Sequence, residues 1–149
     1  MGKVVIVGAN YKQLTKFADN INKLNNQQKQ QFLEACCKEL AARLLAKVIK
    51  RTPSETGELR RGWTGGTKQG ATQYANSLNI QKVGNTYRID ITNPVEYASY
   101  VEYGHRTKDH QGWVQGKFML TISEAELNNA SDAILQKKLN KFMKEVFEL

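Results

Sequence analysis

Apolar and polar positions along the chain predict helices in the first third, strands in the middle and helices at the end. Apolar side chains recur at helical spacing over residues 14–24 and, after a glutamine- and asparagine-rich link at 25–31, over residues 32–49. The second helix should end by Arg51, because Pro53 disfavours helical geometry at the residue before it. Its apolar stripe, which predicts the main contact with the core, comprises Phe32, Leu33, Cys36, Leu40, Ala41, Leu44, Leu45, Val48 and Ile49.

The pattern changes to strand between residues 59 and 92. Pro53 and Gly57 favour a turn that leads from the long helix into this region. Tyr87, Ile89 and Ile91 alternate with charged residues, as in a strand with one buried face, and Gly84 with Asn85 supplies a tight turn. The sequence therefore predicts a hairpin of residues 78–83 and 86–92, preceded by a loose glycine-rich loop at 65–70.

Asn93 and Pro94 end that strand and begin a short aromatic helix at 95–103, followed by a polar loop at 106–116. Two further apolar patterns, at residues 118–127 and 134–147, predict C-terminal helices. The expected fold is α+β, a small antiparallel β-sheet flanked by a long N-terminal helix, the short aromatic helix and the C-terminal helices. We expect one domain over residues 1–149, with an N-terminal arm at 1–8 and an extended loop at 104–117.

Charge and cysteine content indicate the kind of partner and the redox compartment of the protein. The formal net charge is +8 and the sequence pI is about 9.5, which suits a negatively charged partner, either nucleic acid or an acidic protein surface. Acidic residues interleave with the basic ones, which favours ordinary solvated helix faces. Cys36 and Cys37 are adjacent in a helix, so a disulfide between them is not expected and a reducing compartment is. The apolar run at 4–7 is too short for a signal peptide or a membrane span.

Candidate catalytic chemistry is sparse. Glu102, His105, Asp109 and His110 are of ligand type, but Arg106 and Lys108 interrupt them and their positive charge opposes a cation, so solvated loop histidines are the favoured interpretation. Neither a nucleophile elbow nor a phosphate-binding loop is present in the sequence. We therefore predict no catalytic residue, no cofactor and no metal.

Aromatic and basic residues around the polar loop suggest binding instead. Tyr97, Tyr100, Tyr103 and Trp113 could stack on single-stranded bases, although packing of Tyr97 and Tyr100 on the sheet is favoured. Exposed tyrosine, tryptophan and arginine are also enriched at protein interfaces. Arg60 and Arg61 have two interpretations, an ion pair with Glu55 or Glu58, or contact with a neighbouring subunit or DNA. The interface candidates are Arg60, Arg61, Trp63, Tyr100, Glu102, Tyr103, His105, Arg106 and Trp113.

Two blocks form the most specific pattern: residues 52–63, TPSETGELRRGW, and residues 97–105, YASYVEYGH. Together they resemble the signatures of bacteriophage neck and tail-completion proteins, from long-tailed phages and prophage-derived tail-like particles. The entry into the C-terminal helix, residues 116–120 (GKFML), is similar to that family as well, whereas the glycine-rich stretch at 65–70 departs from it. The positions that match the two signatures are Thr52, Pro53, Thr56, Gly57, Leu59, Arg60, Trp63, Tyr97, Ala98, Tyr100, Val101, Glu102, Gly104 and His105.

The resemblance implies a non-enzymatic virion protein that is made in the bacterial cytoplasm. It implies a ring of identical copies, with six-fold symmetry expected, between a head-side connector or stopper and a tail terminator or tail tube. DNA would pass through the channel without sequence-specific binding, and no membrane would be involved. Two alternatives stay open. A DNA-binding or packaging accessory protein predicts basic residues on one surface, and a small metal-dependent nuclease predicts clustered ligands.

Overall fold

The computed structural model describes residues 4–10, 23–54, 57–84 and 86–147. Strand β1 (Val4–Asn10) is followed by helices α2 (Asn26–Arg51), α3 (Glu58–Gly62) and α4 (Ala71–Ser77) and by strands β2 (Gln81–Val83) and β3 (Thr86–Thr92). Helix α5 (Ala98–Tyr103), strands β4 (Gly104–Arg106) and β5 (Trp113–Gln115) and helix α6 (Met119–Phe147) complete the chain. The predicted α+β class is confirmed.

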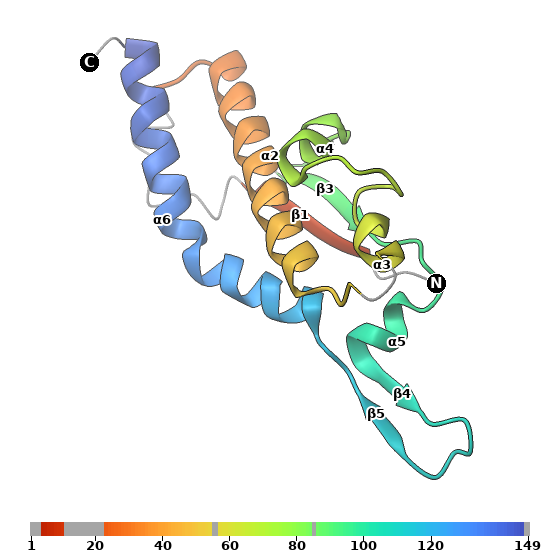
Figure 1. Ribbon diagram of the computed structural model, residues 1–149. Coiled ribbons are helices and arrows are strands. Elements are labelled where there is room, and N and C mark those ends of the chain that lie inside the picture. Colours follow the sequence, from red (N-terminus) through yellow and green to blue (C-terminus); the bar gives the residue numbers. More distant parts are fainter. Residues whose placement is uncertain (1–3, 11–22, 55–56, 85, 148–149) are drawn as a thin grey trace.

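Helix α2 is the centre of the structure. It lies between α6 on one side and α4 with the sheet on the other (Figure 1). The predicted stripe from Phe32 to Val48 is buried, and the helix ends at Arg51 as expected. The link expected at 25–31 is instead the first turns of the helix, because Asn25 and Gln28 cap each other reciprocally, side chain to backbone N–H.

The main sheet is antiparallel with strand order β1-β3-β2. Tyr87, Ile89 and Ile91 alternate as buried positions on β3, and the hairpin turn predicted at Gly84 is present, with a positive φ of 59°. An N-terminal arm was expected at residues 1–8, but its described part belongs to strand β1. Val4 to Asn10 pair antiparallel with β3, from Thr92 back to Thr86. A run rich in valine and isoleucine favours a strand once a partner edge is available.

Residues 58–62 and 71–77 also differ from expectation, because they form helices α3 and α4 rather than strand, with the glycine-rich loop expected at 65–70 between them. Leu59 and Trp63 lie four residues apart, so the short α3 turn places both on its buried side. In α4, Ala75 is buried and Tyr74 packs partly against the core. The two expected C-terminal helices are one continuous helix, α6, since residues 128–133 contain no glycine or proline to break it.

The core joins α2, the sheet and α6. Phe32 of α2 stacks on Phe142 of α6 with ring centroids 5.4 Å apart, and both cysteines are buried as free thiols. The helix expected at 14–24 lies outside the described residues except for Lys23 and Leu24, and Leu24 is buried. Within the described segments, helices long and apolar enough to cross a membrane do not occur.

Candidate assembly site: a projecting hairpin

Strands β4 and β5 form a two-stranded hairpin that extends away from the body of the protein (Figure 1). The extended loop expected at 104–117 is therefore a structured element. Its register pairs Gly104 with Gln115, His105 with Val114 and Arg106 with Trp113. The hairpin begins directly after α5 and ends just before α6, so both of its ends are attached to helices.

The tip of the hairpin is closed by its own hydrogen bonds. The Thr107 N–H donates to the Gly112 carbonyl at 3.0 Å, and the Gly112 N–H donates back to the Thr107 hydroxyl at 3.1 Å. Asp109 accepts from the Thr107 hydroxyl at 2.5 Å and from the Gln111 N–H at 3.0 Å. These two hydrogen bonds, the hydroxyl first, lower the pKa of the exposed Asp109 carboxyl. The tip of the polar loop expected at 106–116 is thus a specific hydrogen-bonded turn.

The base of the hairpin is held by a buried carboxylate, Glu102. Its two oxygens accept from the backbone N–H groups of Leu120 and Thr121, both at 2.9 Å, and from the Thr121 hydroxyl at 2.7 Å. The N–H of Phe118 donates to the Glu102 carbonyl at 3.0 Å. Glu102 therefore caps the start of α6 from a distant position in sequence, where the helix dipole favours negative charge.

Two glycines let the hairpin strands approach each other and the end of α5 closely. Gly104 has φ +87°, and a Cβ there would collide with the Val114 carbonyl oxygen. A Cβ on Gly116 would collide with the Glu102 carbonyl oxygen. Any side chain at either position would push the strands apart.

Large side chains lie exposed along α5 and the hairpin. Trp113 is 59% exposed and Tyr100 60%, while Tyr103 and Val114 are each more than two-fifths exposed. The Tyr100 and His105 rings lie 5.5 Å apart, tilted at 42°. Packing of Tyr100 on the sheet, the favoured sequence interpretation, is therefore wrong. Tyr97 is half-buried against the core, as that interpretation expected, and its hydroxyl donates to Glu58 at 3.3 Å.

The structure separates the remaining interface candidates. Tyr100, Tyr103, His105, Arg106 and Trp113 lie together on α5 and the hairpin, whereas Arg60 and Arg61 lie on α3. Sequence reasoning missed Val114, an exposed residue of β5 that pairs with His105.

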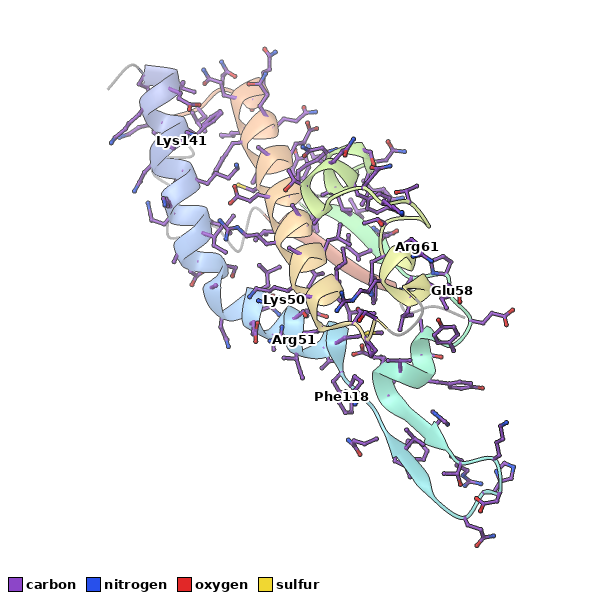
Figure 2. All side chains as sticks on the ribbon, in the orientation of Figure 1. Lys50, Arg51, Glu58, Arg61, Phe118 and Lys141 are labelled. Carbon is purple, nitrogen blue, oxygen red and sulfur yellow. The ribbon has the colours of Figure 1, made fainter. Side chains whose placement is uncertain are left out.

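Two candidates are corrected by their burial. Glu102 is 1% exposed and caps α6, and Trp63 is also 1% exposed, so neither offers a contact surface. The Trp63 indole N–H donates to the Thr52 hydroxyl at 2.9 Å, and Arg60 Nε donates to the Thr52 carbonyl at 2.7 Å. The first sequence block therefore holds the corner between α2 and α3. Arg61, in contrast, is exposed, close to Glu58 on the same short helix (Figure 2).

The structure does not gather Glu102, His105, Asp109 and His110 into one cluster. Across the segments that the structure describes, no group of three or more histidine, cysteine or acidic residues is placed to hold a metal ion. Glu102 points into the start of α6, and Asp109 is engaged by the hairpin tip.

Comparison with known families supplies the deciding observation. The model of the HK97-gp10-like family, described as "Bacteriophage HK97-gp10, putative tail-component", matches residues 15–104. This is more than half of the chain. The chain belongs to the HK97-gp10-like family. Comparison with curated proteins and with solved structures gives no significant match.

Membership identifies the protein as a structural component of a phage tail. The family match runs from before α2 through α5 and ends at Gly104, the first residue of the hairpin. It includes both the α2–α3 corner and Glu102, which fixes the hairpin base. The projecting strands and α6 follow the matched region.

Proposed function

We propose that this tail component acts at the neck, where copies of it form a ring that joins or completes the upper end of the tail around the DNA channel. The observation that carries the proposal is the hairpin of β4 and β5. It presents Trp113 and Val114 to solvent on strands that are fixed to the body at both ends.

Exposed aromatic side chains gain little on an isolated protein and much at an interface. Tryptophan, tyrosine and arginine are the residues that most often dominate binding energy. Here Trp113 and Arg106 are cross-strand partners, with Tyr100 and Tyr103 on the preceding helix. A rigid hairpin loses little conformational freedom when it binds, so more of its contact energy remains for assembly.

The same geometry suits a ring of identical copies. A hairpin at one end of the protein can contact a different surface of the next copy, and such head-to-tail contacts close into a ring when the rotation closes. We propose six-fold symmetry, a head-side connector or stopper on one face and a tail terminator or tail tube on the other. The net charge of +8 suits DNA that passes through without sequence-specific binding.

The proposal requires no catalytic step. The alternative of a small metal-dependent nuclease lacks a supporting cluster in the described residues. The alternative of a DNA-binding accessory protein would be favoured by tight, sequence-selective binding that survives high salt, whereas exposed charges that only line a channel give weak, salt-screened attraction.

The test removes the gene from the phage or prophage and restores it with variants. Deletion should leave unjoined heads and tails, or tails with a defective upper end, which electron microscopy counts directly. The variant Trp113→Ala with Val114→Ala should fold normally yet fail to restore joined particles. Val83→Ala, at an exposed valine on β2 that lies outside the hairpin, is the control and should restore them. Normally joined particles from the clean deletion would refute the proposed role.

A further inference from the structure

Helices α4 and α6 lie on either side of α2 (Figure 1). Residues of these three helices line an open trough over α2. It consists of two adjoining grooves of about 570 and about 430 Å³. The grooves share Glu39, Arg43 and Lys138, so they form one continuous surface. The projecting hairpin contributes nothing to its lining.

Its floor is apolar and shallow. Ala35, Ala42 and Ala46 of α2 line it, and their spacing places them on one face of the helix. From the first to the last of these residues α2 rises by about 16 Å, the length of three helical turns. Short side chains leave room above the floor for side chains from another molecule.

Both walls are tied to α2 by specific contacts. Lys38 Nζ donates to the carbonyl oxygens of Asn76 and Leu78 at the end of α4, at 2.6 and 2.8 Å. On the other side, Lys138 of α6 donates to Glu39 of α2 at 3.2 Å. The trough is therefore a fixed feature of the fold.

Its rim is strongly basic. Arg43, Lys137, Lys138 and Lys141 line the part beside α6, with Glu39 as the one acidic residue among the lining side chains. Glu39 is shared between Lys138 at 3.2 Å and Arg43 at 3.5 Å. Lys137 and Lys141 are exposed and form no ion pair with any residue in the described ranges. The rim thus keeps an excess of positive charge.

We propose that this trough binds an acidic amphipathic helix of a different particle protein, an inference that rests on the proposed function as an assembly component. The apolar face of such a helix would cover the alanine floor, while its carboxylates would meet Lys137 and Lys141 on the rim. This is the helix-in-groove mode of recognition, in which apolar anchors recur along one face of the bound helix.

The charges favour this occupant over the two other candidates. Neither long helix of the described residues is predominantly acidic, because α2 has six basic and two acidic residues and α6 has four of each, so a second copy offers no acidic helix to the basic rim. Duplex DNA would satisfy the lysines but has no apolar side chains for the floor. An acidic protein helix satisfies both features at once.

The test uses photo-cross-linking in cells that produce particles. The photoreactive residue p-benzoylphenylalanine replaces Thr72, an exposed residue of α4 that lines the trough, and the tagged protein is recovered under denaturing conditions after irradiation. Mass spectrometry should map the adduct to an Asp- and Glu-rich helical segment of another particle protein. The same replacement at Gln73, which is exposed but outside the lining, is the control and should not yield this adduct.

Charge reversal supplies the second measurement. Lys137→Glu with Lys141→Glu should lower the yield of the adduct about tenfold, because two attractions become repulsions. Lys23→Glu with Lys68→Glu changes the net charge equally at exposed sites outside the trough and should preserve the yield. An adduct with the chain itself, with DNA or with a segment poor in acidic residues would overturn the proposal, as would the absence of any adduct. Joined particles counted in the same cultures report separately on the proposed function.

Discussion

Replacement of the buried Glu102 is the sharpest test of how the hairpin is held. The variant Glu102→Ala removes the acceptor of three hydrogen bonds from Leu120 and Thr121 at the start of α6. Because Glu102 lies at the end of α5 and these partners begin α6, the same change loosens both ends of the hairpin. Glu102, which matches the second sequence block, should therefore stabilise the fold rather than contact a partner.

The loss in the free energy of unfolding follows from the hydrogen bonds that Leu120 and Thr121 lose. The Leu120 N–H is buried, and leaving such a donor unpaired costs about 1–3 kcal/mol. The Thr121 N–H and hydroxyl are more exposed and regain water, but they still lose bonds to a charged acceptor, so the total cost should be about 3–5 kcal/mol. Glu102→Gln keeps one acceptor oxygen but turns an amide NH2 toward the other donors, which should cost about 1–3 kcal/mol.

Urea unfolding followed by tryptophan fluorescence measures this directly. The chain has two tryptophans: Trp63, buried at the α2–α3 corner, reports on the body, and the exposed Trp113 reports on the hairpin. For a chain of this size, 3–5 kcal/mol corresponds to a fall in Tm of about 6–20 °C. Glu145→Gln, at an exposed position of α6, the helix whose start Glu102 caps, is the control. If Glu102→Ala unfolded at the same urea concentration as Glu145→Gln, the capping role would be refuted.

Three further predictions concern other parts of the structure. Leu44→Ala and Ile89→Ala, at fully buried positions, should each cost about 2–5 kcal/mol in the free energy of unfolding, whereas the exposed Val83→Ala should change it little; equal unfolding midpoints would contradict the packing of α2 on the sheet. Burial raises the pKa of the Cys36 thiol from 9.0 to about 12, so the stability that this protonated thiol contributes is complete below pH 9 and is lost as the pH rises toward 12; alkylation of the native thiol at neutral pH, as fast as in urea, would contradict this. Gly104→Ala should disorder the hairpin without unfolding the body, because its φ of +87° and its contact with Val114 exclude a side chain; unchanged amide exchange in β4 and β5 would show otherwise.

Much of the fold could be predicted where local signals decide it. Pro53 sets the end of α2, and the alternation of Tyr87, Ile89 and Ile91 identifies the buried face of β3, because both signals depend on neighbouring residues only. The strand at Val4–Asn10 was missed since its partner, β3, lies far along the chain. The helix α3 was missed for a related reason, because it is fixed by hydrogen bonds from Trp63 and Arg60 to Thr52 and from Asn93 to the Leu59 carbonyl.

The site was predicted in outline and corrected in detail. The aromatic and basic composition of residues 97–113 indicated a contact surface, and the structure places Tyr100, Tyr103 and Trp113 at its exposed positions. Glu102 and Trp63 were chosen as interface candidates for the same residue types, but both are buried. Sequence alone does not distinguish an exposed aromatic or acidic side chain from one that caps a helix or packs in a corner. The salt bridges of Glu126 with Lys47 and Arg51, which lower the pKa of the Glu126 carboxyl and link α2 to α6, were likewise invisible in the sequence pattern.

The rigidity of the hairpin bears on how a small protein could enter a large assembly. A stable protein interface buries about 800 Å² on each partner, more than the exposed faces of two three-residue strands can supply. The hairpin would therefore act together with other contacts in the proposed ring, while the basic trough over α2 would hold a different particle protein. Because both surfaces are fixed by contacts within the chain, Glu102 for the hairpin and Lys38 and Lys138 for the trough, neither has to be ordered when a neighbour binds. Weak contacts that are already ordered add up in a closed ring, since each copy is held by two neighbours and must break both to leave.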